Sequence, residues 1–163
     1  MSNVIPMPRL EIRPARTEDL EAVTRMVADV WREIYAHYLP AGSADAGSDT
    51  HIADLVGDPG KNGWVAVLGR RIVGYCSITG NCIEQVWVGA SMRRQGIGTE
   101  LTRRAIDTIR SRGFAFAQMG CEDFNTGVRA FLEAENWTCI GSETRSMANG
   151  QRYDAQVYSR SVG

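Results

Sequence analysis

Three strand-like runs follow one another in the middle of the chain, and they restrict its fold more than any other feature. Residues 64–68, 72–78 and 82–88 are rich in β-branched and aromatic side chains. Short turns that contain glycine, 69–71 and 79–81, separate them. Because short turns of this kind join antiparallel neighbours, the sequence predicts a three-stranded meander here.

Further strands and helices are predicted on both sides of the meander. Helices are expected where apolar residues recur every three or four positions, and strands where short apolar runs lie between turn residues. The helices are predicted at 17–38, 51–56, 98–112 and 125–135, and the additional strands at 10–13, 114–121, 137–145 and 153–159. About seven strands, mostly antiparallel, with about four helices predict an α/β fold built on one mixed sheet.

The charge balance excludes several classes of partner. The 163 residues include 18 Lys and Arg against 19 Asp and Glu, which gives a formal net charge of -1. This balance provides no general attraction for nucleic acid or for an anionic membrane. The length suits one domain over residues 1–163, with residues 1–8 expected to be flexible. A phosphate-binding function must then come from a local site.

Targeting and redox features predict a cytoplasmic protein. The first residues do not have the pattern of a signal peptide, and no apolar run is long enough for a transmembrane helix. Cys76, Cys82, Cys121 and Cys139 form no C-x-x-C pair, and we expect them to pack as small apolar side chains. The histidines form no ligand pattern with them, so we expect no metal.

The most informative motif is Arg-Arg-Gln-Gly-Ile-Gly-Thr at residues 93–99, between a predicted strand and a predicted helix. Gly96 and Gly98 permit a tight turn in which successive N–H groups converge on one anion. The N-terminus of the helix adds unpaired donors and the positive end of its dipole. Arg93 and Arg94 can add charge-assisted contacts to phosphate oxygens. The segment therefore predicts a cradle for a pyrophosphate.

Three kinds of phosphate-binding loop can be compared with this segment. A Walker-type loop requires Gly-Lys-Ser/Thr where the chain has Gly98-Thr99-Glu100. A dinucleotide fingerprint requires a third glycine where Leu101 stands, and a βαβ unit in place of hairpins. An acyl-coenzyme A loop requires [Arg/Gln]-x-x-Gly-x-[Gly/Ala], which Arg93-x-x-Gly96-x-Gly98 matches at every specified position. The motif therefore favours acyl-coenzyme A, with ATP or NAD as the alternative ligands.

Other segments extend this match along nearly the whole chain. Residues 83–88 resemble the fourth strand of the GNAT superfamily of N-acetyltransferases, which directly precedes the family's coenzyme loop. Asn125, followed by Phe131 and Trp137, resembles the family's second motif, N-x-x-A-x-x-x-Y-E-x-x-G-F. The resemblance implies a GNAT-like fold in which the sheet splays between its fourth and fifth strands, with acetyl-CoA or CoA as cosubstrate.

The resemblance also implies roles for individual residues. Backbone groups of Val86 and Val88 would pair with the pantetheine arm like an added strand. Asn125 would bond the coenzyme near its thiol end, although it is also a good helix N-cap. The remaining implied coenzyme contacts are Trp87, Arg93, Arg94, Gln95, Gly96, Ile97, Gly98, Thr99 and Phe131.

One position departs from the family pattern. Counting back from Trp137 places Leu132 where the family usually has a tyrosine that protonates the departing thiolate. Leucine has no proton to donate, so we assign no general acid. Either another group or water supplies the proton, or the thiolate leaves unprotonated, because a thiol with a pKa of about 8.5 is a fair leaving group.

Amine acetylation also requires a base, because an ammonium has no lone pair with which to attack a thioester. Glu84 is the first candidate, since strict alternation puts it on the strand face of Val86 and Val88. It can equally be a polar residue near the end of a strand. Glu122 and Asp123, after the fifth strand, are the next candidates, as bases or as groups that hold the amine.

The identity of the acceptor is the least determined feature. Trp31 and Tyr35 lie four apart on the first predicted helix, where they are either core residues or, as the resemblance implies, acceptor contacts. We expect direct transfer from acetyl-CoA to a primary amine of a small molecule or protein in a ternary complex. The alternative is a sensor that binds acyl-CoA with little catalysis, and a homodimer is left open.

Overall fold

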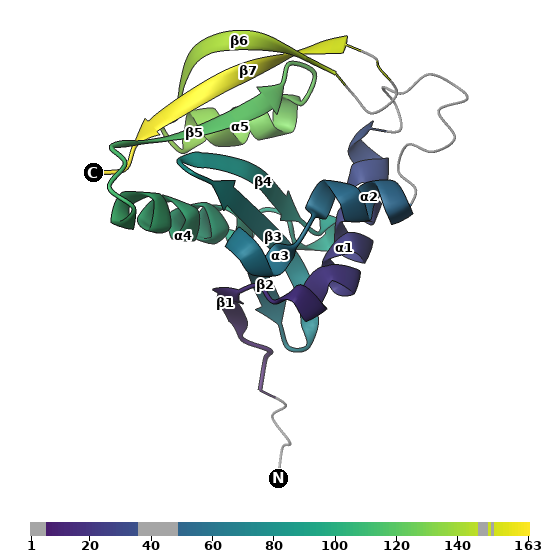
Figure 1. Cartoon of the computed structure of the whole chain (residues 1–163). Helices are drawn as coiled ribbons and strands as arrows, with labels where there is room; N and C mark the ends of the chain where they lie inside the picture. Colours follow the sequence, from purple (N-terminus) through teal and green to yellow (C-terminus); the bar gives the residue numbers. More distant parts are fainter. Residues whose placement is uncertain (1–5, 36–48, 147–149, 151) are drawn as a thin grey trace.

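The computed structural model describes residues 6–35, 49–146, 150 and 152–163. Its strands form one seven-stranded sheet in the order β1-β2-β3-β4-β5-β7-β6 (Figure 1). The strands are β1 (Leu10–Pro14), β2 (Gly63–Leu68), β3 (Arg71–Thr79), β4 (Cys82–Val88), β5 (Phe116–Glu122), β6 (Thr138–Ser146) and β7 (Arg152–Ser161). Six neighbouring pairs make up the sheet, and five of them are antiparallel. The predicted strands and the predicted meander of β2, β3 and β4 are confirmed.

Four helices of eight residues or more lie in the described part of the chain, in agreement with the predicted number. They are α1 (Leu20–Tyr35), α2 (Asp49–Val56), α4 (Ile97–Ser111) and α5 (Thr126–Ala134). The second helix ends at Val56 as predicted, and one further helical turn that was not predicted follows it, α3 (Pro59–Asn62), which Asp58 caps through its side chain. The predicted end of the first helix falls in residues 36–48, and residues 1–5 of the predicted flexible segment also lie outside the described residues.

The pairing of β4 with β5 is short, and it divides the sheet in two. These parallel strands pair at two positions, Cys82 with Gln118 and Ile83 with Met119, although both strands continue for several residues beyond them. The predicted splay between the fourth and fifth strands is therefore confirmed. From residue 84 onward, the edge of β4 that faces β5 has no strand partner among the described residues.

Helices cover the two faces of the sheet differently. On one face α1 and α2 pack over β2, β3 and β4, with Val27, Trp31 and Ile52 in their core (Figure 1). On the other face α4 and α5 pack against the sheet through a second core that includes Leu101 and Leu132. The amphipathic spacing of apolar residues in α1 and α4 accounts for this arrangement, because each helix buries one stripe.

A β-bulge in β4 changes the face on which its side chains lie. Ser77 pairs with Gln85 and Ile78 with Ile83, so Glu84 is the extra residue. As a result Ile83 lies in the same core as Val86, whereas strict alternation would have put them on opposite faces. The expectation that Glu84 shares a face with Val86 and Val88 by simple alternation is therefore wrong, because alternation is interrupted at Glu84 itself.

Two further findings concern the cysteines and the helices. Cys76 and Cys121 are buried as predicted, but Cys139 is exposed on the edge strand β6. Among the described residues, no helix combines the length and the apolar character needed to cross a membrane.

Candidate active site

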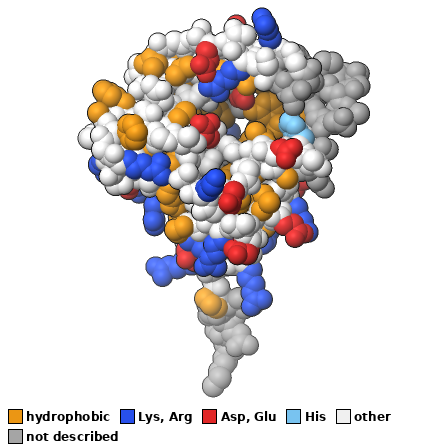
Figure 2. Space-filling model, in the orientation of Figure 1, with side chains coloured by type: hydrophobic (Ala, Val, Ile, Leu, Met, Phe, Trp, Pro, Cys, Tyr) orange, Lys and Arg blue, Asp and Glu red, His pale blue; other side chains and the backbone are white. Residues whose placement is uncertain are grey.

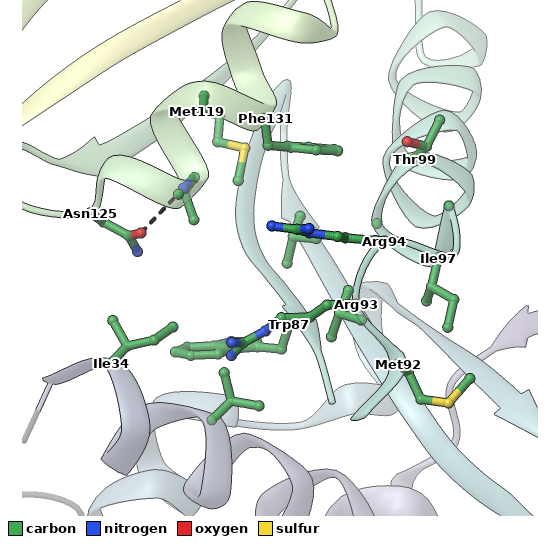
Figure 3. A pocket seen from close by; sticks show the side chains of 18 residues that line it. Ile34, Trp87, Met92, Arg93, Arg94, Ile97, Thr99, Met119, Asn125 and Phe131 are labelled. Atoms are coloured by element: carbon green, nitrogen blue, oxygen red, sulfur yellow. Dashed lines mark hydrogen bonds between the residues drawn. The ribbon is translucent and has the colours of Figure 1, made fainter. Parts of the chain in front are cut away.

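A cavity of about 650 Å³ lies where β4 and β5 diverge and where α4 begins (Figure 3). It includes eleven of the twelve residues that the sequence assigned to the coenzyme; Gln95 is the exception. Those eleven are Val86, Trp87, Val88, Arg93, Arg94, Gly96, Ile97, Gly98, Thr99, Asn125 and Phe131. These eleven residues, which lie up to 45 positions apart in the sequence, thus line one space.

The loop before α4 has the backbone geometry of an anion-binding turn. Gly96 is the N-cap of α4 with φ 77°, and no atom lies within 4 Å of the position that a Cβ would occupy there. Arg94 also has a positive φ, 62°, a conformation that costs a residue with a side chain roughly 1–3 kcal/mol. Gly96 and the first residues of α4, Ile97 to Thr99, line the cavity, and the first turn of a helix carries backbone N–H groups without intrahelical partners.

The two arginines of the loop behave differently. Arg93 forms a two-fold ion pair with Glu33 on α1, with N–O distances of 2.8 Å and 3.3 Å. This contact ties the loop to α1. Arg94 forms no ion pair among the described residues, and Figure 3 shows its side chain extending into the cavity. Arg94 is therefore the better placed of the two to meet an anionic ligand.

Asn125 has two functions in the structure as it stands. Its Oδ1 accepts a hydrogen bond of 3.2 Å from the backbone N–H of Val128, which caps α5. Its side chain lines the cavity (Figure 3), and its Nδ2 makes no hydrogen bond to any described residue. The helix cap fixes the amide and leaves its N–H donors for a ligand.

Trp87 is held by a chain of hydrogen bonds from α2. The Gln85 side chain donates to the carbonyl of Leu55 at 2.9 Å, and the Trp87 indole N–H donates to Gln85 at 3.1 Å. The indole thereby forms a fixed wall between the cavity and the α1 face of the sheet. Trp87 packs with the core beneath α1, whereas its neighbours Val86 and Val88 pack with the core beneath α4.

The predicted acceptor residues lie beside this wall and not in the cavity. Trp31 is buried and stacks on Tyr35 with ring centroids 5.3 Å apart. The Tyr35 hydroxyl donates to Glu122 Oε1 at 2.8 Å, and burial, followed by the nearby Glu122 carboxylate, raises the pKa of Tyr35. The structure thus brings Trp31, Tyr35 and Glu122 together, although nothing in the sequence linked Glu122 to the other two.

The remaining catalytic candidates are less enclosed. Glu84 and Asp123 are exposed, and neither lines the cavity. Glu84 stands at the point where β4 leaves β5, as the bulge and the short pairing require. Leu132 is fully buried in the core beneath α5, so its side chain contacts apolar neighbours and has no proton to supply.

Several lining residues were not anticipated from the sequence. They are Val30, Ile34, Met92, Met119, Gly127, Val128 and Ala130. The apolar stripe of the first helix contains Val30 and Ile34, and alternation along β5 would have placed Met119 on the α4 face. Nothing in the sequence, however, indicates that these apolar faces end at a cavity. In the described residues no group of three or more His, Cys, Asp or Glu side chains is arranged to hold a metal ion.

Comparison with known proteins agrees with this geometry. No curated protein matches the chain. A GCN5-related N-acetyltransferase from Rhodopseudomonas palustris is similar over 99% of both chains, with 18% identity and a TM-score of 0.76. The PaiA N-acetyltransferase from Thermoplasma acidophilum, solved with coenzyme A, has 13% identity and a TM-score of 0.70 over 94% of this chain and 99% of its own. YncA, a putative acetyltransferase from Salmonella typhimurium solved with acetyl-CoA, has 18% identity and a TM-score of 0.65 over 95% of both chains.

These structural similarities establish the fold, and the sequence of the chain establishes the family. The model of the acetyltransferase (GNAT) family matches residues 28–136, about two thirds of the chain. The matched region contains β4, the loop at 93–99, α4 and Asn125, all of which contribute to the cavity. The chain therefore belongs to the GNAT family of acetyltransferases.

Proposed function

We propose that the protein transfers an acetyl group from acetyl-CoA to a primary amine of a small molecule or protein, by direct attack in a ternary complex. The observation that carries this proposal is the divergence of β4 and β5 next to the cavity at the start of α4. The divergence opens the sheet from both faces, so two substrates can meet there without competing for one entrance.

The residues of the cavity fit a coenzyme A molecule. The open space above Gly96 and the amides at the start of α4 suit a pyrophosphate. The free edge of β4 at Val86 and Val88 suits the amides of a pantetheine arm, which would pair with it as an extra strand. Phe131 and Met119 provide apolar walls for the same arm.

The thioester would supply an activated acyl carbon. The amine nitrogen forms the new C–N bond, the C–S bond breaks, and the electron pair of that bond leaves on the coenzyme sulfur. The ammonium loses one proton to a base before it attacks, and the nitrogen loses a second after the C–N bond forms, so the amide keeps one N–H. Glu84 remains the predicted base, supported by its position where β4 leaves β5, with Glu122 and Asp123 as alternatives.

Leu132 supports transfer in which no tyrosine protonates the sulfur. A leaving thiolate is tolerable because thiols have a pKa of about 8.5. The same residue is also the reason to keep the second candidate function, an acyl-CoA sensor that binds the coenzyme with little turnover.

The decisive test is a panel of amines incubated with acetyl-CoA, with release of free thiol as the readout. Thiol release that depends on the amine, together with a mass increase of the amine by one acetyl group, supports the transferase. Stabilisation by acetyl-CoA without turnover of any amine supports the sensor. Stabilisation by ATP or NAD, and not by acetyl-CoA, would contradict both.

A further inference from the structure

Five aromatic side chains from distant segments gather on the α1 face of the sheet, next to the coenzyme cavity. We call them the ring cluster: Trp31 and Tyr35 of α1, Trp87 of β4, Phe124 after β5 and Tyr153 of β7. Tyr35 stands at the centre, with ring centroids 5.3 Å from Trp31, 6.5 Å from Trp87 and 6.0 Å from Phe124. Phe124 in turn lies 6.1 Å from Tyr153. Four separate elements thus contribute to one aromatic wall.

A single carboxylate lies among these rings. Glu122 accepts the hydrogen bond from the Tyr35 hydroxyl at 2.8 Å, and it has no ion-pair partner among the described residues. Its side chain is on the face opposite the α4 core, because Cys121 and Met119 point into that core. Burial and the adjacent Glu122 carboxylate raise the pKa of Tyr35 above that of an ordinary phenol, and the Tyr35 hydroxyl is a donor to Glu122.

The ring cluster is continuous with the coenzyme cavity. Trp87 belongs to both, and Phe124 directly precedes Asn125, which lines the cavity. Figure 2 shows a hollow in the molecule, with hydrophobic side chains inside it and charged side chains of both signs around it. A molecule held against Glu122 would therefore lie close to an acyl group held at the free edge of β4.

Charges near the outer side of the cluster are already compensated. Arg145 on β6 is paired with Glu143, and its guanidinium lies directly over Gly120, where any Cβ would come within 2.5 Å of it. Tyr153 lies beside Arg145, its partner in the pairing of β7 with β6. The pair of Arg145 and Glu143 therefore offers no net charge to a ligand.

We propose that the ring cluster and Glu122 form the acceptor site, and that the acceptor is a primary amine with one positive charge and a flat apolar body, such as an arylalkylamine. This inference rests on the proposed transferase function. A buried ammonium must be paired and hydrogen-bonded, which Glu122 and the ring faces provide. A second ammonium, or the hydroxyls of an amino sugar, would lose their hydrogen bonds to water when buried against the rings and would gain no hydrogen bonds in return.

The test compares kcat/KM for 2-phenylethylamine, 1,4-diaminobutane and glucosamine at saturating acetyl-CoA. We expect the aromatic amine to exceed both others by about tenfold or more, which is the scale of one buried cation–π contact plus apolar burial. Equal or higher kcat/KM for the diamine or the amino sugar would overturn the proposal.

Two variants connect this preference to the site. Glu122→Gln keeps the size of the side chain and removes its charge, and we expect the KM for 2-phenylethylamine to rise about tenfold or more while the KM for acetyl-CoA stays constant. Tyr153→Leu removes one ring and should raise the KM for the aromatic amine but not for a short alkylamine. Glu133→Gln on α5 is the control, because Glu133 is exposed and lines neither site.

A binding measurement separates failure of this inference from failure of the proposed function. Calorimetry of 2-phenylethylamine with the CoA-saturated protein needs no turnover. Binding that Glu122→Gln weakens about tenfold, without thiol release from any amine, would support the site and contradict the transferase. A different result would retain the transferase and overturn the acceptor site: the protein acetylates other amines, and Glu122→Gln binds 2-phenylethylamine as tightly as the wild type does.

Discussion

Replacement of Gly96 by aspartate tests the pyrophosphate cradle, and the same replacement at Gly113 is its control. Both glycines have a positive φ, 77° and 89°, and neither has an atom within 4 Å of the position of a Cβ. They flank opposite ends of α4. Each variant therefore adds the same side chain and charge at the same backbone cost of about 1 kcal/mol.

Gly96→Asp should have the weaker coenzyme binding of the two variants, and Gly113→Asp should have the lower stability. For a separation taken as about 5 Å between the carboxylate introduced by Gly96→Asp and a bound phosphate, the repulsion at an effective dielectric of about 20 is about 3 kcal/mol. The Kd for acetyl-CoA should therefore rise by about a hundredfold or more. An anion at the N-terminus of α4 is favourable to the helix, whereas one beyond its C-terminus is unfavourable, by about 0.3–1 kcal/mol in each case.

Calorimetric titration with acetyl-CoA and thermal unfolding provide the assay. We expect Gly96→Asp to fold with nearly the wild-type Tm and to lose coenzyme binding. We expect Gly113→Asp to have a lower Tm and to bind the coenzyme as the wild type does. Binding by Gly96→Asp within about threefold of the wild type would show that no phosphate lies at the start of α4. Equal loss of affinity for acetyl-CoA in both variants would contradict the explanation that the charge at position 96 repels a nearby phosphate.

Three further predictions concern other parts of the molecule. Glu84→Gln should lower kcat and flatten the pH–rate profile without changing the Kd of acetyl-CoA; an unchanged profile would transfer the role of base to another group. The Arg13 guanidinium lowers the pKa of Asp19 from its ordinary value, so Asp19→Asn should reduce the free energy of unfolding by about 1 kcal/mol at pH 7. Urea titrations should show this difference vanish as the pH falls through the lowered pKa. Thiol reagents should modify Cys139 first and leave Cys76 unmodified in the folded protein, because burial raises the pKa of Cys76 to about 12; peptide mapping would detect the opposite order.

The coenzyme side of the site could be predicted because its signals are local. The segment 93–99 combines turn residues and a helix start in seven consecutive positions, and the structure folds it accordingly. The splay between the fourth and fifth strands followed from the family resemblance, which depends on short motifs in a fixed order. The pairing of Arg93 with Glu33 was not predictable, because the partners lie 60 positions apart.

The acceptor side could not be predicted because its residues meet only through tertiary structure. Tyr35 and Glu122 are 87 positions apart, and Tyr153 follows 31 positions later. Each alone is an ordinary helix or strand residue. The bulge at Glu84 was also invisible in the sequence, since alternation along a strand is the default and an extra residue leaves no compositional mark.

The brief contact between β4 and β5 has a consequence for how the molecule opens and closes. The strands before it, β1 to β4, and those after it, β5 to β7, are each contiguous in sequence and internally antiparallel. Such units can exchange their amide hydrogens separately, with different opening free energies. A ligand that pairs with the free edge of β4 while touching Asn125 would join them. Deuterium uptake should therefore slow on both sides of the gap at once when the coenzyme binds.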